Sequence, residues 1–128
     1  MDPISNMLNS IKNAGAAKLP SVTVPHSNLC LAVAELLARE GYVNAVAKKG
    51  KKTRKYIEIG VSYAGARPRV TGVQRLSKPS RRMYMGVRDM RPVRQGYGLL
   101  VLSTPKGLMT GSEARKEHVG GEALFQKW

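Results

Sequence analysis

Apolar residues recur at helical spacing near the start of the chain. One face of residues 4–13 carries four such side chains, namely Ile4, Met7, Leu8 and Ile11. This pattern predicts an amphipathic helix. Asp2 suits the N-terminal cap and Pro3 the first turn, and Gly15 is expected to end the helix.

A second helix is predicted over residues 29–39, after a short extended segment at 21–24. Ser27 can cap this helix, and Gly41 can stop it. The apolar stripe of the helix consists of Leu29, Val33, Leu36 and Leu37. Cys30 lies within the helix and is expected to be a small, buried or half-buried side chain.

Two segments of alternating polarity, residues 42–46 and 56–63, predict strands. Between them, residues 48–55 read Lys-Lys-Gly-Lys-Lys-Thr-Arg-Lys. Because like charges at this density repel one another, the segment is interpreted as a hairpin tip that becomes ordered only against an anion. A mobile, solvated loop is the alternative. The order helix–strand–helix–strand–strand predicts a compact α/β lobe.

The second half of the chain predicts a mainly β lobe with short helices, which makes the whole an α/β (α+β) protein. The Gly- and Pro-containing segment 64–69 is interpreted as the boundary, which gives lobes 1–66 and 67–128. The expected elements of the second lobe are a short helix at 73–76, a strand at 82–86, a helical turn at 89–94, a buried strand at 98–102, a turn at 103–107, a strand at 108–109, a helix from the capping box Thr110-x-x-Glu113 to about 117, and a last strand at 122–128.

The chain is strongly basic, and its charge is concentrated in the middle. Its 22 Lys and Arg against 8 Asp and Glu give a net charge of +14. Residues 41–94 hold 15 of these basic residues and two of the acidic ones, and so account for +13. Such a field attracts polyanions, and nucleic-acid phosphate backbones are the commonest of them. A solvated surface that only aids solubility is the alternative. An anionic membrane is disfavoured because no basic amphipathic helix carries Trp or Phe on its apolar face.

Several other classes of protein are disfavoured. A single Cys excludes a disulfide framework and a cysteine-based zinc site. His26 and His118 lack metal-ligand spacing, and Gly50-Lys51-Lys52 lacks the upstream glycine of a phosphate-binding loop. No apolar run is long enough to span a bilayer, and residues 1–3 do not resemble a signal peptide. We therefore expect a soluble, cytoplasmic protein that is not an enzyme and uses no cofactor or metal.

The turn at 103–107 is a candidate RNA contact. It contains the hydroxyls of Ser103 and Thr104, the cation of Lys106 and the flexible Gly107. Hydroxyls can bond phosphate oxygens, base edges and the ribose hydroxyl. The alternative is an ordinary polar hairpin turn.

Two further segments have chemistry that suits RNA. Tyr84 follows Arg81 and Arg82, a combination that favours base stacking with phosphate contact, although a half-buried strand tyrosine is the alternative. Gly120-Gly121-Glu122 allows the main chain to approach a partner closely, and its carboxylate could accept hydrogen bonds from base amino groups. A simple helix-to-strand turn is the alternative for that segment.

Three stretches resemble the bacterial family of small-subunit ribosomal protein eight. One runs from Leu99-Leu100-Val101-Leu102-Ser103-Thr104-Pro105-Lys106-Gly107-Leu108-Met109-Thr110 to Val119-Gly120-Gly121-Glu122. The others are Asp2-Pro3-Ile4-x-x-Met7-Leu8-x-x-Ile11-x-Asn13-Ala14 and Thr71-Gly72-Val73-x-Arg75-x-Ser77-Lys78-Pro79-x-x-Arg82-x-Tyr84. The resemblance extends in order from residue 2 to about 124.

The resemblance implies an N-terminal α/β lobe packed on a mainly β C-terminal lobe. It implies a structural protein that binds the central domain of 16S rRNA at an irregular internal-loop helix and supports early subunit assembly. Neighbouring small-subunit proteins and the chain's own operon mRNA, whose translation it would repress, are further implied partners. A translational regulator outside the ribosome is the second interpretation, and an RNA-modifying enzyme is the third.

The resemblance also implies RNA contacts at particular positions. In the C-terminal lobe they are Ser103, Thr104, Tyr84, Gly120, Gly121 and Glu122. In the N-terminal lobe, Asp2, Pro3, Asn6, Asn13 and Lys18 would touch a second RNA element, and Lys51, Lys52 and Lys55 would follow a phosphate backbone. Pro105, where the family often has Ser, has neither a hydroxyl nor an N–H to offer. The aromatic residues after Glu122 are shifted from the family pattern, so no RNA contact is assigned beyond it.

Overall fold

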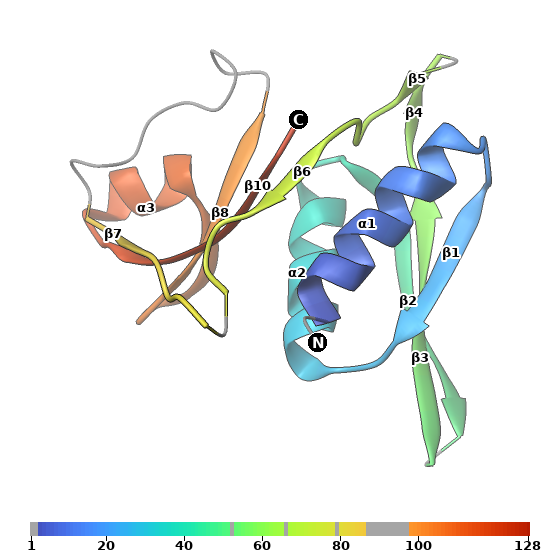
Figure 1. The fold of residues 1–128 in the computed structure, drawn as a ribbon, viewed down its shortest axis with the longest axis horizontal. Helices are drawn as coiled ribbons and strands as arrows, with labels where there is room; N and C mark the ends of the chain where they lie inside the picture. The colour runs from blue at the N-terminus through green and yellow to red at the C-terminus, as the bar shows by residue number, and fades with distance from the viewer. Residues whose placement is uncertain (1–2, 52, 66, 79, 87–97) are drawn as a thin grey trace. The chain divides into compact units, whose positions relative to one another are not determined.

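The computed structural model describes residues 3–51, 53–65, 67–78, 80–86 and 98–128. The chain forms two compact units, residues 1–71 and 72–128, and the division lies a few residues after the boundary expected at 66–67. Helices and strands are mixed along the chain, as expected for an α+β fold (Figure 1). The helical turn expected at 89–94 lies outside the described residues.

Helix α1 (Pro3–Ala16) buries the predicted apolar stripe, but it does not end at Gly15 as expected. Gly15 lies inside the helix and is buried. A Cβ at this position would lie 2.7 Å from the Cβ of Pro68, so the glycine allows close packing of the helix on that residue. The helix ends just before Lys18, which has a positive φ of 61°.

Helix α2 (Asn28–Arg39) begins one residue before the predicted start and ends where the sequence predicts. Val33, Leu36 and Leu37 of the predicted stripe are buried, whereas Leu29, in the first turn, is exposed. The Ser27 hydroxyl accepts a hydrogen bond from the Cys30 amide at 3.1 Å and so caps the first turn. Gly41, with φ +84°, follows the last turn, a conformation that glycine adopts without steric cost. Cys30 is buried in the core of this unit, as expected.

The sheet of the first unit has the strand order β1-β3-β2 and is antiparallel throughout. Its strands are β1 (Ser21–Pro25), β2 (Val43–Lys51) and β3 (Arg54–Val61). Ile57, Ile59 and Val61 alternate along β3 and are buried on the face that α1 and α2 cover. A short pair, β4 (Tyr63–Ala64) and β5 (Arg67–Pro68), follows this sheet.

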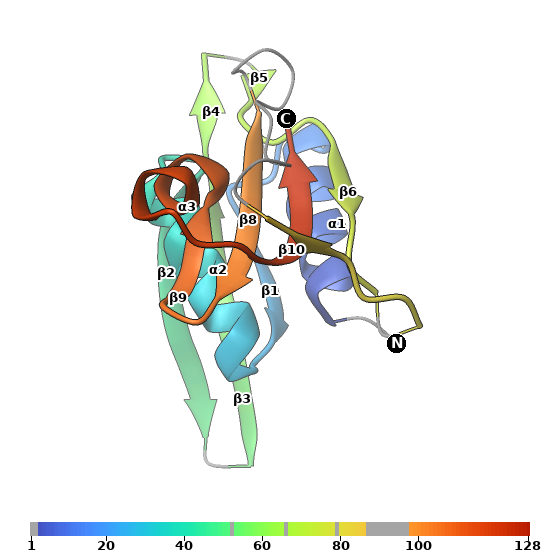
Figure 2. The same cartoon turned by 90° about the vertical axis from the view of Figure 1, so that its left-hand side faces the viewer.

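The basic segment at 48–55 is more regular than the sequence predicted. Strands β2 and β3 continue through it, so that Lys48 pairs with Ile57 and Lys51 with Arg54. Gly50 opposes Lys55 with φ +103°, and a Cβ at Gly50 would lie 2.2 Å from the Arg54 carbonyl oxygen. Figures 1 and 2 show the β2–β3 ribbon projecting beyond the helices of its unit. We call residues 48–55 the basic arm.

The second unit is built around β10 (Gly121–Lys127) as its central strand. On one side it pairs with β6 (Val73–Arg75) and β7 (Tyr84–Met85), and on the other with β8 (Leu99–Thr104). Strand β9 (Gly107–Thr110) pairs with the far edge of β8. Figure 2 shows β6, β10 and β8 side by side.

The prediction of a short helix at 73–76 is wrong, because β6 occupies that position. Val73 and Arg75 pair with Lys127 and Phe125 of β10, and the Arg75 guanidinium donates a hydrogen bond to the Leu124 carbonyl oxygen. These partners lie about fifty residues further along the chain. The pairing therefore overrides the local apolar spacing that suggested a helix.

Helix α3 (Gly111–Glu117) is held by the predicted capping box. The Thr110 hydroxyl accepts from the Glu113 amide at 3.2 Å, while the Glu113 carboxylate accepts from the Thr110 amide at 3.1 Å. The helix ends at His118, whose φ of 55° is left-handed. A core beneath it joins α3 to one face of the sheet and consists of Leu100, Leu102, Met109, Ala114 and Ala123.

Gly15→Ala should destabilise the chain, because the new methyl group would overlap Pro68 in a close-packed site. The expected cost is about 1–3 kcal/mol in the free energy of unfolding, measured by urea denaturation. Asn9→Ala, at an exposed position of the same helix, is the matched control and should leave stability unchanged or slightly raised. An equal effect of the two substitutions would show that Gly15 is not closely packed.

Candidate nucleic-acid interface

Three residues singled out from separate parts of the sequence lie in one row across the second unit. Glu122 of β10 pairs with Tyr84 of β7 on one side and with Ser103 of β8 on the other. Paired residues of neighbouring strands share a face of the sheet. Ala123 and Leu102, the next pair along, belong to the core under α3, so the row lies on the opposite face. We call Tyr84, Glu122 and Ser103 the cross-strand row.

Tyr84 is the most exposed member of the row, with 71% of its surface accessible. Its ring is therefore open to stack on a planar ligand, and the alternative of a half-buried strand tyrosine does not hold. Ser103 is half-buried, and its hydroxyl makes no hydrogen bond with any described residue. The row thus offers an aromatic plane, a hydroxyl and a carboxylate in sequence across three strands.

The Glu122 carboxylate is held in place by its own chain. Its Oε2 accepts hydrogen bonds from the Ser77 hydroxyl and, at 3.0 Å, from the Arg82 guanidinium. The side chain of Glu122 is only 16% exposed, whereas that of Arg82 is 60% exposed. The Ser77 hydrogen bond, together with Arg82, holds the pKa of Glu122 below its ordinary value even though burial acts in the other direction.

Sequence reasoning assigned no role to Ser77, which follows the helix expected at 73–76. Ser77 is buried, and its hydroxyl also accepts from the Met83 amide at 3.1 Å. It therefore links the segment before Tyr84 to the central strand. No local pattern points to it, because its acceptor lies 45 residues away.

The two glycines before Glu122 allow close approach between strands of the chain itself. A Cβ on Gly120 would lie 2.5 Å from the Met85 carbonyl oxygen, and one on Gly121 would lie 2.2 Å from that of Ser103. Neither glycine has a positive φ. Their lack of a side chain therefore allows β10 to pack closely between β7 and β8.

The turn between β8 and β9 is shorter than predicted, since Thr104 already pairs with Gly107. The Thr104 hydroxyl donates to the Gly107 carbonyl oxygen at 2.8 Å and accepts from the Lys106 amide at 3.1 Å. Only 9% of Thr104 is exposed. Gly107 has φ +109°, which closes the turn in a conformation that other residues rarely adopt. Thr104 therefore shapes the turn that follows Ser103.

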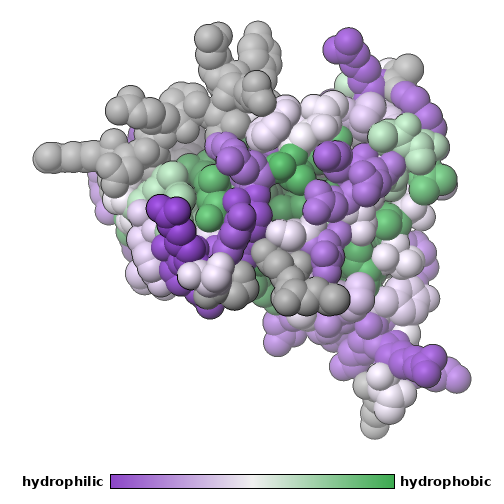
Figure 3. All heavy atoms as spheres, in the orientation of Figure 1, coloured by the Kyte–Doolittle hydropathy of each residue, from purple (hydrophilic) through white to green (hydrophobic). Residues whose placement is uncertain are grey.

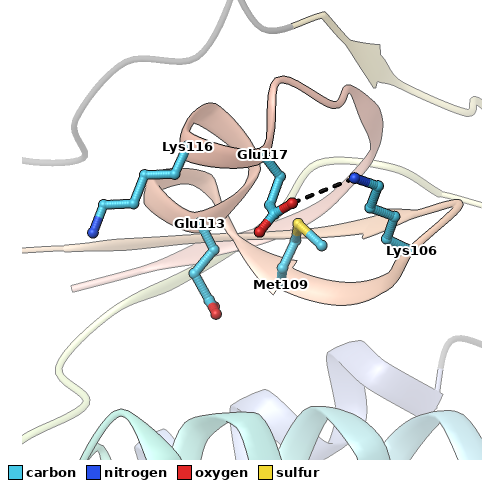
Figure 4. Close-up of a pocket in the computed structure, with 5 residues that line it drawn as sticks. All are labelled: Lys106, Met109, Glu113, Lys116 and Glu117. Carbon is cyan, nitrogen blue, oxygen red and sulfur yellow. Dashed lines mark hydrogen bonds and ion pairs between the residues drawn. The ribbon is translucent and has the colours of Figure 1, made fainter.

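Lys106 extends from this turn over a hollow beside α3. The hollow has a volume of about 430 Å³ and is lined by Lys106, Met109, Glu113, Lys116 and Glu117. In Figure 4 the side chains of Lys106 and Glu117 point toward one another near Met109, whereas Lys116 points away. The Lys106 Nζ lies 3.3 Å from a Glu117 carboxylate oxygen in an exposed ion pair. Such a pair is weak enough for Lys106 to exchange Glu117 for a phosphate.

The basic arm presents cations on both of its faces. Strand alternation and the pairing with β3 put Lys49, Lys51 and Arg54 on the face that the helices leave open, and Lys48 and Lys55 on the other. Lys49 is bound to Glu58 at 3.2 Å. In Figure 3 the projecting end of the first unit is strongly hydrophilic. Lys52, also predicted to bind RNA, lies outside the described residues.

The predicted N-terminal contacts lie on the exposed side of α1 and just after it. Pro3, Asn6 and Asn13 are exposed, and the Asn6 carbonyl oxygen accepts from the Ser10 hydroxyl. Lys18 is exposed too, with its ammonium group 6.0 Å from the centre of the Tyr63 ring. Asp2 lies outside the described residues. These positions belong to the first unit, whereas the cross-strand row belongs to the second.

Within the described ranges, no group of three or more His, Cys, Asp or Glu side chains is arranged to hold a metal ion. Within the same ranges, no helix is long and apolar enough to cross a bilayer.

Arg81, predicted to bind RNA beside Arg82, is exposed and exchanges backbone hydrogen bonds with Lys78.

Glu122→Gln should lower the free energy of unfolding at neutral pH by about 1–2 kcal/mol, because hydrogen bonds to a charged carboxylate are stronger than those to an amide. Since the pKa of Glu122 is lowered on folding, its charge stabilises the fold above the unfolded pKa, and this contribution disappears as the pH falls through the folded pKa. Urea denaturation from pH 7 to pH 3 should therefore show the two proteins converging in acid.

Glu117→Gln is the matched control for this measurement. It removes an equal charge from an exposed ion pair and should change stability by less than about 0.5 kcal/mol at any of these pH values. A difference between Glu122→Gln and the unchanged protein that does not shrink between pH 7 and pH 3 would contradict the role given to the Glu122 charge.

Comparison with known proteins places these features in a family. The chain matches the family of ribosomal protein S8 over residues 2–128. It is 42% identical to small ribosomal subunit protein uS8 of Dictyoglomus thermophilum, and the match covers 99% of this chain and 97% of the relative. It is 41% identical to the uS8 protein of Persephonella marina, with 99% and 98% covered, and 40% identical to that of Mycoplasmopsis agalactiae, with 99% and 97% covered. All three relatives are named as small ribosomal subunit proteins. The chain therefore belongs to the ribosomal protein S8 family.

Proposed function

We propose that this chain is a structural constituent of the small ribosomal subunit and binds 16S rRNA through the cross-strand row, the β8–β9 turn and the basic arm. The observation that carries the proposal is the register of β7, β10 and β8, which aligns Tyr84, Glu122 and Ser103 on one face. The names of the relatives and the concentration of positive charge in the middle of the chain support it.

Each member of the row has a distinct task in this proposal. A splayed base stacks on the exposed Tyr84 ring. The Ser103 hydroxyl donates to or accepts from a base edge or ribose hydroxyl. The Glu122 Oε1, which makes no hydrogen bond with the described residues, accepts from a base amino group while Oε2 stays bound to Ser77 and Arg82. Gly120 and Gly121 contribute half-buried backbone beside this carboxylate.

Cations surrounding the row would position the RNA backbone without reading its sequence. Arg82 neutralises Glu122 and leaves N–H groups for a phosphate, while Arg81 adds charge next to it. Lys106 and Gly107 follow Ser103 in the β8–β9 turn, and Lys106, which lies beside α3, would add a phosphate contact at the edge of the sheet. Thr104 acts by holding this turn in shape, since both of its hydroxyl bonds are made within it.

The target within 16S rRNA is, in this proposal, an irregular internal-loop helix of the central domain. Irregular helices display splayed bases, which suits a surface with one aromatic plane and a few polar groups. Binding such a helix early would hold it in its folded shape and so support subunit assembly. The same surface would bind a mimic of this helix in the chain's own operon mRNA and repress its translation.

A second RNA element would meet the first unit. Pro3, Asn6, Asn13 and Lys18 are exposed, and amides and ammonium groups suit sugar–phosphate contacts. Asp2, outside the described residues, belongs to the same proposed contact. The basic arm, including Lys51, Lys52 and Lys55, would follow a phosphate backbone. Neighbouring small-subunit proteins complete the set of partners.

Sedimentation of a native lysate tests the central proposal. A structural constituent should move with the small subunit and remain there in moderate salt. Recovery only in the ribosome-free fractions would contradict the proposal and favour a regulator acting outside the ribosome.

Ser103→Ala should weaken binding to the cognate internal-loop RNA by about 1–2 kcal/mol, roughly 5- to 30-fold, because an RNA polar group is left unpaired. Fluorescence anisotropy with a labelled RNA hairpin measures this loss. Ser112→Ala, which removes a hydroxyl from the exposed side of α3, is the matched control and should bind like the unchanged protein. An equal loss on a scrambled hairpin would show that Ser103 does not contribute to selectivity.

Replacing Lys51 and Lys55 together with Ala should reduce the slope of log affinity against log salt by up to about two, because each phosphate contact releases counterions. Filter binding between 50 and 300 mM KCl measures the slope. The control replaces Arg39 and Lys116, which removes the same charge away from the arm and should leave the slope nearly unchanged. An unchanged slope in the Lys51 and Lys55 variant would mean that the arm does not meet phosphate.

A further inference from the structure

Tyr56 lies on the face of the first unit's sheet that the helices leave open, and no role has been assigned to it so far. It is 39% exposed, whereas its neighbour Ile57 is fully buried on the opposite face. In the described part of the chain, the Tyr56 hydroxyl makes no hydrogen bond and the Tyr56 ring makes no cation–π contact. Few large apolar side chains are this exposed in the described residues, and Tyr84 of the cross-strand row is another.

The strand register surrounds Tyr56 with a particular set of neighbours. Pro25 of β1 lies opposite it on one side and Lys49 of β2 on the other. Arg54 precedes it by two positions on the same face, and Lys51 lies opposite Arg54. We call Tyr56, Pro25, Lys49, Lys51 and Arg54 the Tyr56 face.

Positive charge dominates this face. Glu58, two positions after Tyr56, is the acidic residue that shares the face along β3, and it is bound to Lys49. Lys51 and Arg54 make no ion pair with any described residue, so both are available to an anion. Two cations without an ion pair to a described residue therefore lie near the Tyr56 ring: Arg54 on the same strand and Lys51 opposite Arg54 on β2.

The surface beside Tyr56 is hollowed. Thr23, Val24, Pro25, Arg54, Lys55 and Tyr56 line a depression of about 460 Å³. Its lining combines the Tyr56 ring, Pro25, the Thr23 hydroxyl and the Arg54 cation, with Lys55 joining from the opposite face of β3. It therefore suits a ligand with both a planar ring and a negative charge.

We infer that the Tyr56 face binds one unpaired nucleotide of RNA, with the base against the Tyr56 ring and the adjoining phosphates at Arg54 and Lys51. This inference deepens the proposed RNA-binding function, on which it rests, by adding a site for single-stranded RNA in the first unit. Base–aromatic stacking beside cations is how proteins hold single strands without reading their sequence. An acidic protein segment would satisfy the cations but would leave the aromatic plane and the hollow unused.

Short single-stranded RNA tests the inference with the full chain. Tyr56→Ala should weaken binding to a labelled hexa-adenylate by about 5- to 100-fold, measured by fluorescence anisotropy. Tyr56→Phe, which keeps the aromatic plane, should bind within about twofold of the unchanged protein. Tyr56→Leu, which keeps apolar area but not the plane, should resemble Tyr56→Ala. Leu29→Ala removes an equally exposed apolar side chain from the same unit and should have no effect.

Thermal unfolding of each variant shows whether the substitution has damaged the fold, so that a loss of binding can be assigned to the side chain. Photo-crosslinking of the unchanged protein gives a second readout. A hexanucleotide that contains 4-thiouridine should crosslink to the peptide with Tyr56. Crosslinks confined to other peptides, or equal affinities of the Ala, Leu and Phe variants, would overturn the inference. So would displacement of the RNA by a hexaglutamate peptide at an equal concentration.

Measuring the internal-loop hairpin in parallel separates this inference from the proposed function. If Ser103→Ala weakens hairpin binding while Tyr56→Ala does not affect hexa-adenylate binding, the inference fails and the proposed function stands. If the hairpin binds no better than a scrambled RNA while hexa-adenylate binding still depends on Tyr56, the proposed function fails and the Tyr56 site stands.

Discussion

The pairing of β10 with β7 on one side and β8 on the other is the constraint on which the candidate interface depends. Two glycines without side chains let β10 fit between those strands, and the next residue, Glu122, is then held by Ser77 and Arg82. Because Ser77 also binds the Met83 amide, the segment that carries Tyr84 is tied to the same strand. The position of the exposed tyrosine is therefore set by its backbone pairing with Glu122 and by the part-buried hydrogen bonds of Ser77.

Under the proposed function, the two units would use different interactions to bind a polyanion. In the second unit, an aromatic ring, a hydroxyl and a neutralised carboxylate form a small surface in which geometry matters more than charge. In the first unit, a two-stranded ribbon carries cations on both faces, and its pairing continues through a segment of strong mutual repulsion. Hydrogen bonds of the β2–β3 ladder, together with the Lys49–Glu58 ion pair, offset that repulsion. A surface of the first kind favours selectivity, and one of the second kind favours affinity that depends on salt.

Some features assigned to RNA in the sequence also have a structural task. The Thr104 hydroxyl closes its own turn, and Gly120 and Gly121 accommodate neighbouring strands of the same chain. Conversely, Tyr56 was taken only as part of a strand, although its ring is exposed between cations. Residue type shows which hydrogen bonds a side chain can make. Only the structure shows which of its donors and acceptors already have partners within the chain.

The sequence by itself determined the two long helices with the Ser27 cap, the capping box at Thr110 and Glu113, the succession of strands and the basic middle of the chain. These features depend on periodicity, local caps and composition, which act over a few residues. The tertiary structure alone decided that residues 73–75 form a strand, that Gly15 lies within a helix against Pro68, and that Ser77 holds Glu122. Each of these depends on a partner more than forty residues away, and local propensity carries no information about such a partner.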